Sequence, residues 1–349
     1  KSNNIYNTTF FANGSEQFIL NKIYPELYNI YNIKYKKDNE KYLSKQKEIN
    51  EKLTIDEIIK KIGKELDINV TLLSDNWVTI LEKDNDIHYI QGYKFELNNH
   101  GIGNIMDDKG LFFDLLSYKG LPTVYQKVIF HGYNKKNVID FFHDYQDEII
   151  VKGNIGTCGR EVYKINDEKD LINKIDYLLQ SQFSLSLSPY YKIKNEYRVI
   201  LLNQEVRVIY GKERPEVIGD GKTSLQELAI KFNDFYQSNL INNPSYIPKL
   251  NEKVVLNYQF NLSNGAKMFL DIDSDLKEKI IALAKDVVKT LNISFASVDI
   301  IDTENNELLV LEANSGVMMN NYIKQCENGY NVAYNLYRDA IKLMFKMNK

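Results

Sequence analysis

Residues 308–316 read LLVLEANSG, and the residue types in this stretch could do chemistry. An apolar run leads directly into Glu312, and Asn314 follows two positions later. Residues two apart on a strand point to the same face. A carboxylate and a carboxamide on one face at a strand end are unusual for packing alone, so this stretch is a candidate site.

A third polar side chain belongs to the same candidate site. Asp299 follows the apolar run FASV, and a turn at 303–306 separates this strand from the next. Antiparallel pairing through that turn would bring Asp299 close to Glu312. Oxygen ligands of this kind suit Mg²⁺. The structural alternative is a cross-strand acid pair with an asparagine that caps a helix.

The segment EIIVKGNIGTCGREV suggests a phosphate-binding loop. Lys152 ends a buried strand and is followed by Gly153, Gly156 and Gly159. Glycines let backbone N–H groups approach a phosphate closely, and the lysine adds a positive charge. The loop is not a Walker motif because no GK[ST] follows, and not a dinucleotide fingerprint because it leads into a strand.

Arginine is scarce, and its distribution points to the same part of the chain. The chain has Arg160, Arg198, Arg207, Arg214 and Arg338. Three of them fall between 198 and 214. The planar guanidinium suits phosphate and carboxylate better than an ammonium group does. The segment 160–214 is therefore expected to handle anions, with chance clustering as the alternative.

Composition excludes several classes of function. The 349 residues carry 44 basic and 47 acidic side chains, a net charge of −3, so no basic excess indicates nucleic acid. Mean hydropathy is −0.40, and the apolar runs are too short to span a bilayer. Cys158 and Cys326 form no disulfide framework or metal-ligand spacing. With no signal-like start, the expected location is the cytoplasm.

Periodicity predicts a mixed α/β protein of two or three domains. A weak helical pattern at 15–31 precedes a polar stretch. Further helices are expected at 53–68, 107–122, 138–145, 168–181, 224–232, 276–292 and 332–346. Strands are expected at 70–74, 77–83, 87–97, 148–152, 183–188, 196–202, 205–210, 295–302 and 307–314. The IGDG at 218–221 predicts a tight, hairpin-like reversal.

Six segments between 106 and 320 resemble, in order, the ATP-grasp carboxylate–amine ligases. They are DDKGLFFDLLSYKGLPT, EIIVKGNIGTCGREV, LSLSPYYKIKNEYRVILL, KERPEVIGDGKTSLQELA, NYQFNLSNGA and the pair SVDII and VLEANSG. The fourth is similar to a run in cyanophycin synthetase and in bifunctional glutathione-forming ligases.

This resemblance implies a role for individual residues. The implied ATP contacts are Lys109, Lys152, Gly156, Thr157, Gly159 and Asn261 at the phosphates, Ser188, Tyr190 and Tyr191 at adenine, and Glu196 at the ribose. Arg198 and Arg214 would be catalytic. Asp299, Glu312 and Asn314 would hold Mg²⁺, as two ions for which Mn²⁺ can substitute.

The resemblance also implies a fold and an activity. Two α+β subdomains, 106–183 and 184–349, would clasp ATP, preceded by a small α/β substrate-side domain at 1–105. The activity would be ATP-dependent amide formation through an acyl phosphate, with amino-acid or peptide substrates. No nucleic acid or membrane partner is expected, and a homodimer is compatible with the resemblance. The alternatives are another acceptor, such as an ester, a thioester or phosphotransfer, and a catalytically silent nucleotide-binding regulator.

Overall fold

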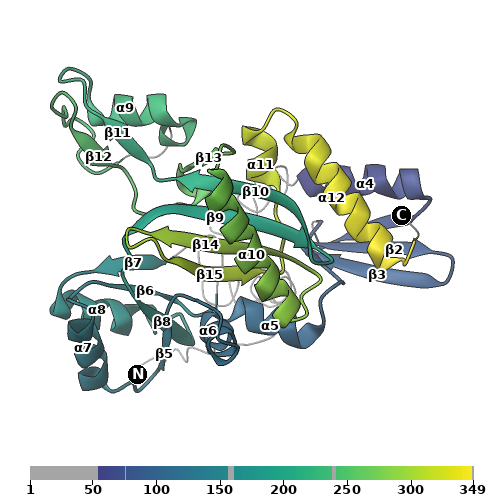
Figure 1. Cartoon of the computed structure of the whole chain (residues 1–349), viewed down its shortest axis with the longest axis horizontal. Coiled ribbons are helices and arrows are strands. Elements are labelled where there is room, and N and C mark those ends of the chain that lie inside the picture. Colours follow the sequence, from purple (N-terminus) through teal and green to yellow (C-terminus); the bar gives the residue numbers. More distant parts are fainter. Residues whose placement is uncertain (1–53, 75, 156–160, 238–240, 348–349) are drawn as a thin grey trace, which may run out of the picture.

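The computed structural model describes residues 54–74, 76–155, 161–237 and 241–347. The helical pattern expected at 15–31 lies outside these residues. In the described ranges, every helix is too short or too polar to cross a bilayer. Figure 1 shows a large central sheet with a smaller helix-backed sheet on one side and a third unit at its far end.

The N-terminal unit is one helix packed on a four-stranded antiparallel sheet of order β1-β2-β3-β4. Its elements are α4 (Thr54–Leu66), β1 (Asn69–Leu73), β2 (Val78–Lys83), β3 (Asp86–Gln91) and β4 (Lys94–Phe95). The apolar stripe of α4, with Ile55, Ile58 and Ile62, is buried. The expected α/β character of this segment is therefore confirmed.

Two short helices follow where the sequence predicted one. They are α5 (His100–Asp107) and α6 (Lys109–Tyr118). Asp108 breaks the helix because its backbone is extended, and its side chain accepts a hydrogen bond from the N–H of Leu111. Asp108 thus caps α6. Gly120, with φ of +70°, follows the end of this helix, where a left-handed backbone favours glycine.

The small unit has its own antiparallel sheet, of order β5-β8-β6-β7, backed by two helices. Its elements are β5 (Lys127–Phe130), α7 (Lys135–Asp144), β6 (Ile149–Gly153), β7 (Val162–Ile165), α8 (Glu168–Leu178) and β8 (Ser184–Pro189). Strand β8 lies between β5 and β6. The expected boundary at 183/184 therefore cuts this sheet, which ends at Pro189.

The large sheet has the order β13-β10-β9-β14-β15, with every neighbouring pair antiparallel. Its strands are β9 (Ile193–Leu202), β10 (Glu205–Glu213), β13 (Lys267–Phe269), β14 (Phe295–Thr303) and β15 (Leu308–Asn314). Together with the small unit, it confirms the expected mixed α/β class.

The segment between β10 and β13 differs from one sequence prediction. It contains β11 (Glu216–Ile218), α9 (Leu225–Phe232), η2 (Asp234–Gln237), β12 (Lys253–Val255) and η3 (Leu262–Asn264). The reversal expected at 218–221 is wrong, since β11 pairs with the distant β12. Asp220 instead accepts hydrogen bonds from the N–H groups of Lys222 and Thr223, which leads the chain into α9.

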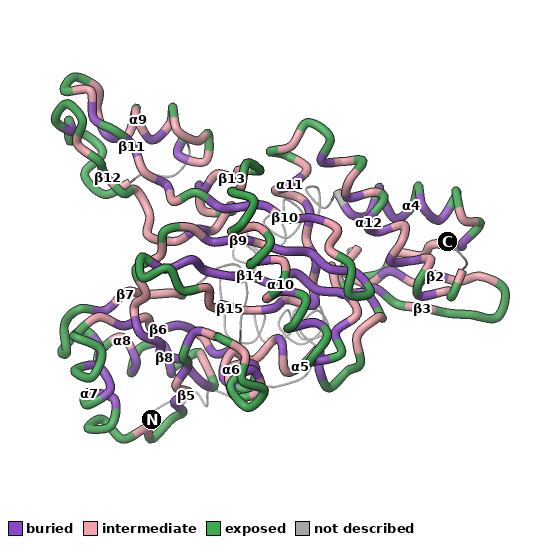
Figure 2. The backbone as a smooth tube through the Cα atoms, in the orientation of Figure 1, coloured by how far each residue is buried: buried purple, intermediate pink, exposed green. Residues whose placement is uncertain are grey.

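Both faces of the large sheet are covered, which leaves little of it exposed (Figure 2). One face packs with the N-terminal unit, α11 (Asn320–Gln325) and α12 (Gly329–Met344). The other packs with α5, α6 and α10 (Ser274–Thr290). The small unit has a separate core. Polar side chains buried on the large sheet therefore require a specific explanation.

Candidate functional site

A row of charged side chains crosses the large sheet from β10 to β15. The register pairs Lys212 with Glu196, Arg198 with Asp299, and Asp299 with Glu312. Directly opposite residues of neighbouring strands point to the same face. The predicted proximity of Asp299 and Glu312 is confirmed, and the β9–β10 hairpin extends their pair into a row.

Asp299 is the centre of this row. The Nε of Arg198 donates to its Oδ1 at 2.7 Å, and a terminal nitrogen of Arg198 donates to its Oδ2 at 2.5 Å. The Nζ of Lys212 lies 3.3 Å from Oδ1 of Asp299. Burial raises the pKa of the Asp299 carboxyl, but the charges of Arg198 and Lys212 outweigh burial and hold the pKa below its usual value. Both carboxylate oxygens thus have cationic partners.

Lys212 is the residue of this row that sequence reasoning missed. It is 4% exposed and forms an ion pair with Glu196 as well as with Asp299. Burial raises the pKa of Glu196, and the charge of Lys212 opposes that effect. One sequence feature could have identified Lys212. It lies two positions after Tyr210 on the same strand, so the two side chains point to the same face.

Glu312 and Asn314 are the part of the row that could hold a metal ion. Their side chains lie on the same face, since the amide nitrogen of Asn314 donates to Glu312 Oε1 at 3.0 Å. Glu312 forms no ion pair with another described residue. Carboxylate and carboxamide oxygens suit Mg²⁺. Asp299 does not fit the predicted ligand set in this state, because Arg198 and Lys212 already occupy its oxygens.

The described residues contain no cluster of three or more histidine, cysteine or acidic side chains that could hold a metal. Asp299 and Glu312 are only two such side chains, because the third candidate ligand, Asn314, is an amide. A divalent cation at Glu312 and Asn314 would therefore have to complete its coordination with water and substrate oxygens, as Mg²⁺ commonly does.

Two lysines from earlier in the chain, Lys109 and Lys152, lie near Glu312 of this row. Burial lowers the pKa of Lys109, while the charges of Glu312, Asp108 and Asp107 oppose this. Lys152 is the last residue but one of β6 and is 8% exposed, and its ammonium makes no hydrogen bond to a described residue. Burial, and then repulsion from Lys109, lower its pKa to about 8, although Glu312 and Glu196 act in the opposite direction. Two positive charges therefore converge near Glu312.

Asn154 holds these two lysines in place, and sequence reasoning missed it. Its Oδ1 accepts from the N–H of Gly110 at 3.0 Å, and its Nδ2 donates to Asp108 Oδ2 at 2.8 Å. Its carbonyl accepts from the N–H of Lys109 at 3.2 Å. Asn154 is 2% exposed. One buried side chain thus joins the start of α6 to the end of β6.

The structure places Arg214 and Asn261 on segments that flank the large sheet. A terminal nitrogen of Arg214 donates to the carbonyl of Ile193 at 2.8 Å, and its guanidinium lies 5.1 Å from the ring centre of Phe260. The buried Nε of Arg214 has no hydrogen-bond partner among the described residues. Asn261 caps η3 by accepting from the N–H of Ser263 at 2.9 Å. Arg214 therefore retains a donor for an anion.

The predicted adenine segment is partly used by the small sheet. Ser188 lies within β8 opposite Ile150, and the N–H of Tyr190 donates to the carbonyl of Glu148 at 3.1 Å. That N–H of Tyr190 is therefore not available to adenine. The hydroxyl of Tyr191 accepts from the N–H of Tyr125 at 3.3 Å. The predicted contacts Gly156, Thr157 and Gly159 lie outside the described residues.

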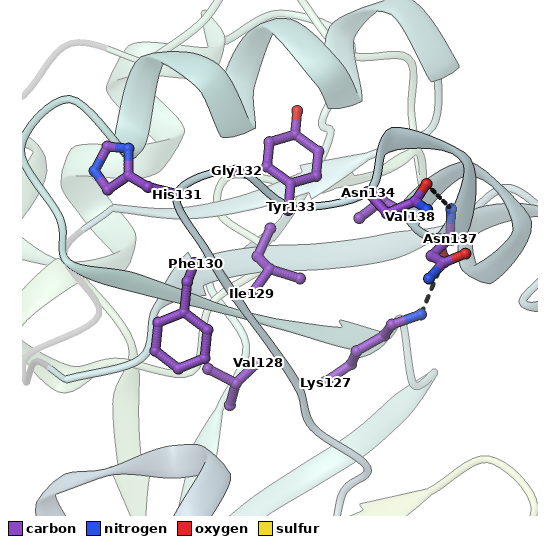
Figure 3. Close-up of a pocket in the computed structure, with 10 residues that line it drawn as sticks. All are labelled: Lys127, Val128, Ile129, Phe130, His131, Gly132, Tyr133, Asn134, Asn137 and Val138. Atoms are coloured by element: carbon purple, nitrogen blue, oxygen red, sulfur yellow. Dashed lines mark hydrogen bonds between the residues drawn. The ribbon is translucent and has the colours of Figure 1, made fainter.

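A pocket in the small unit is separate from the charged row. Figure 3 shows that its lining comes from β5, the following turn and the start of α7, with Lys127 donating to the carbonyl of Asn137 at 2.9 Å. None of the predicted site residues lines it. The candidate site is therefore the charged row with Lys109 and Lys152.

Comparison with known proteins finds similarity only among solved structures, because no family model and no curated protein matches the chain. A bifunctional glutathione synthetase from Pasteurella multocida is 18% identical, with 80% of this chain and 42% of that chain covered and a TM-score of 0.47. D-alanine–D-alanine ligase from Bacillus anthracis is 15% identical, with 70% and 67% covered and a TM-score of 0.47.

A further similar structure is the ATP-grasp ligase PsnB complexed with a minimal precursor. It is 14% identical, with 70% of this chain and 63% of that chain covered and a TM-score of 0.42. The solved structures named here are ligases or synthetases. This chain spans less than half of the glutathione synthetase. At these identities and TM-scores, an activity has to be inferred from the residues of this chain.

Proposed function

We propose that the chain binds Mg·ATP at the charged row and uses it to join a carboxylate to an amine. The observation that carries this proposal is Lys152, a largely buried residue whose ammonium makes no hydrogen bond to a described residue. A buried charge without a partner is costly, and a phosphate would supply the partner. The order of the six ATP-grasp-like segments along the chain supports the same ligand.

Each part of the site then has a distinct task. Lys109 and Lys152 contact the phosphates, and Asn154 fixes the distance between their backbones. Glu312 and Asn314 hold a divalent cation, which when bound offsets the charge on the transferring phosphoryl group. Arg214, whose Nε has no hydrogen-bond partner among the described residues, would stabilise developing negative charge.

The reaction requires positioning rather than a protein nucleophile. An oxygen of the substrate carboxylate attacks the γ-phosphorus of ATP, which forms an acyl phosphate and releases ADP. The amine nitrogen then attacks the acyl carbon, loses a proton, and displaces inorganic phosphate. Arg198 donates to both oxygens of Asp299, so its role is to maintain this ion pair instead of contacting the substrate.

The resemblance to ATP-grasp ligases favours amino acids or short peptides as substrates, and a substrate panel tests this. The full chain is incubated with Mg·ATP and pooled, then single, amino acids and dipeptides. ADP release and the mass of the products are measured. Substrate-dependent ADP release with a condensed product supports the ligase. ATP that binds but stays intact in every pool indicates a nucleotide-binding regulator, and phosphorylated product indicates a phosphotransferase. An absence of ATP binding would overturn the proposal.

A further inference from the structure

Asp299 occupies a position where the ATP-grasp resemblance implies a metal ligand, but its surroundings are those of a closed ion pair. Its carboxylate is 1% exposed. Three nitrogen contacts reach its two oxygens, at 2.7 and 2.5 Å from Arg198 and at 3.3 Å from Lys212. A Mg²⁺ ion needs an oxygen at about 2.1 Å, which these donors would have to vacate.

The charges around Asp299 balance without a metal ion. Glu196 and Asp299 contribute two negative charges, and Arg198 and Lys212 contribute two positive charges. Glu196, Asp299 and Lys212 are all less than 9% exposed. A divalent cation on Asp299 would lie directly against both of these cationic side chains, which is unfavourable while they hold its oxygens.

Glu312 differs from Asp299 both in its burial and in its ion pairing. It is only partly buried, and it forms no ion pair with a described residue. The amide of Asn314 lies beside it, 3.0 Å from Oε1. Of the two facing acids, Glu312 is therefore the one that keeps both charge and space for a cation.

We propose that Arg198 and Lys212 take over Asp299 permanently, so that the site holds one divalent cation, on Glu312 and Asn314, instead of two. Lys212 is then a positioning residue that, together with Arg198, holds the Asp299 carboxylate. This inference rests on the proposed function, since it concerns the metal content of the nucleotide complex.

Counting bound Mn²⁺ tests the proposal directly. The full chain is saturated with a non-hydrolysable ATP analogue, and bound Mn²⁺ is measured by electron paramagnetic resonance while analogue binding is measured by calorimetry. The expected stoichiometry is about one Mn²⁺ for each bound analogue. Two ions for each bound analogue would overturn the proposal but leave the proposed function intact. An analogue that does not bind would instead reject the proposed function, and this inference with it.

A matched pair of variants locates the ion. Glu312→Gln is expected to weaken Mn²⁺ binding to the analogue complex by about tenfold or more. Asp299→Asn is expected to leave the Mn²⁺ affinity nearly unchanged. A loss of Mn²⁺ in folded Asp299→Asn, checked by circular dichroism, would overturn the assignment. The wild-type stoichiometry decides the question even where Asp299→Asn does not fold.

Discussion

Replacing Lys152 by methionine should stabilise the nucleotide-free protein at pH 7. The ammonium is 8% exposed and has no hydrogen bond to a described residue. Burial, followed by repulsion from Lys109, lowers its pKa from 10.5 to about 8. Methionine has a similar length and no charge, so it removes the unfavourable interaction and keeps most of the packing.

The lowered pKa gives the size and the pH dependence of this gain. At about 1.4 kcal/mol for each pH unit, holding the proton on Lys152 costs roughly 3 kcal/mol at pH 7. Between pH 8 and 10.5 the unfolded lysine binds a proton and the folded one does not, so the wild-type free energy of unfolding rises with pH. The advantage of Lys152→Met is therefore constant below pH 8 and declines toward zero near pH 10.5.

Urea denaturation followed by circular dichroism measures both effects. Wild type, Lys152→Met and the control Lys136→Met are compared at pH 7 and at pH 10; Lys136 is 80% exposed. We expect a gain of about 1 to 3 kcal/mol for Lys152→Met at pH 7, with most of it lost at pH 10, and no change for the control. A less stable Lys152→Met, or a gain equal at both pH values, would refute an unfavourable environment for the charged form of Lys152.

Three further changes test other parts of the account. Asn154→Ala should lower the free energy of unfolding by about 1 to 3 kcal/mol, since it leaves the N–H of Gly110 unpaired, and should weaken ATP binding measured by calorimetry. Asp299→Asn should cost about 3 kcal/mol in urea denaturation because Arg198 loses its carboxylate partner and the buried Lys212 keeps only Glu196. Gly211→Ala should lower the stability by about 1 to 3 kcal/mol in the same assay, since a β-carbon there would lie 2.0 Å from the ring of Phe269. Unchanged stability in any of these variants contradicts the corresponding contact.

The acids of the site could be predicted because their signal is local. The hairpin of β14 and β15 follows from two apolar runs and a short polar turn, and antiparallel pairing then brings Asp299 opposite Glu312. Lys152 could be placed at a strand end in the same way. In each case the relevant residues lie within one strand or one hairpin.

The partners of these residues could not be predicted because they come from distant parts of the chain. Arg198 and Asp299 are 101 residues apart, and Asn154 and Gly110 are 44 apart. Their contacts depend on the order of strands in each sheet, which no single segment encodes. The same reason explains why β8 belongs to the small sheet, although the sequence suggested a boundary before it.

The structure of the IGDG segment at 218–221 could not be predicted for a different reason. Asp-Gly suits a tight turn, but an aspartate before a serine-capped helix also accepts hydrogen bonds from the following N–H groups. Asp220 does the latter, and Ser224 with Glu227 forms a capping box on α9. Local sequence allows both outcomes, and the distant partner of β11 decides between them.

The most direct test of the central claim is binding of a non-hydrolysable ATP analogue, with Mg²⁺, to wild type, Lys152→Met and Lys136→Met by titration calorimetry. The site predicts one saturable binding event for wild type and the control, and a loss of affinity of about tenfold or more for Lys152→Met because a charge-assisted phosphate contact disappears. Equal affinity in all three proteins, or no binding to wild type, would contradict an ATP-phosphate site at Lys152.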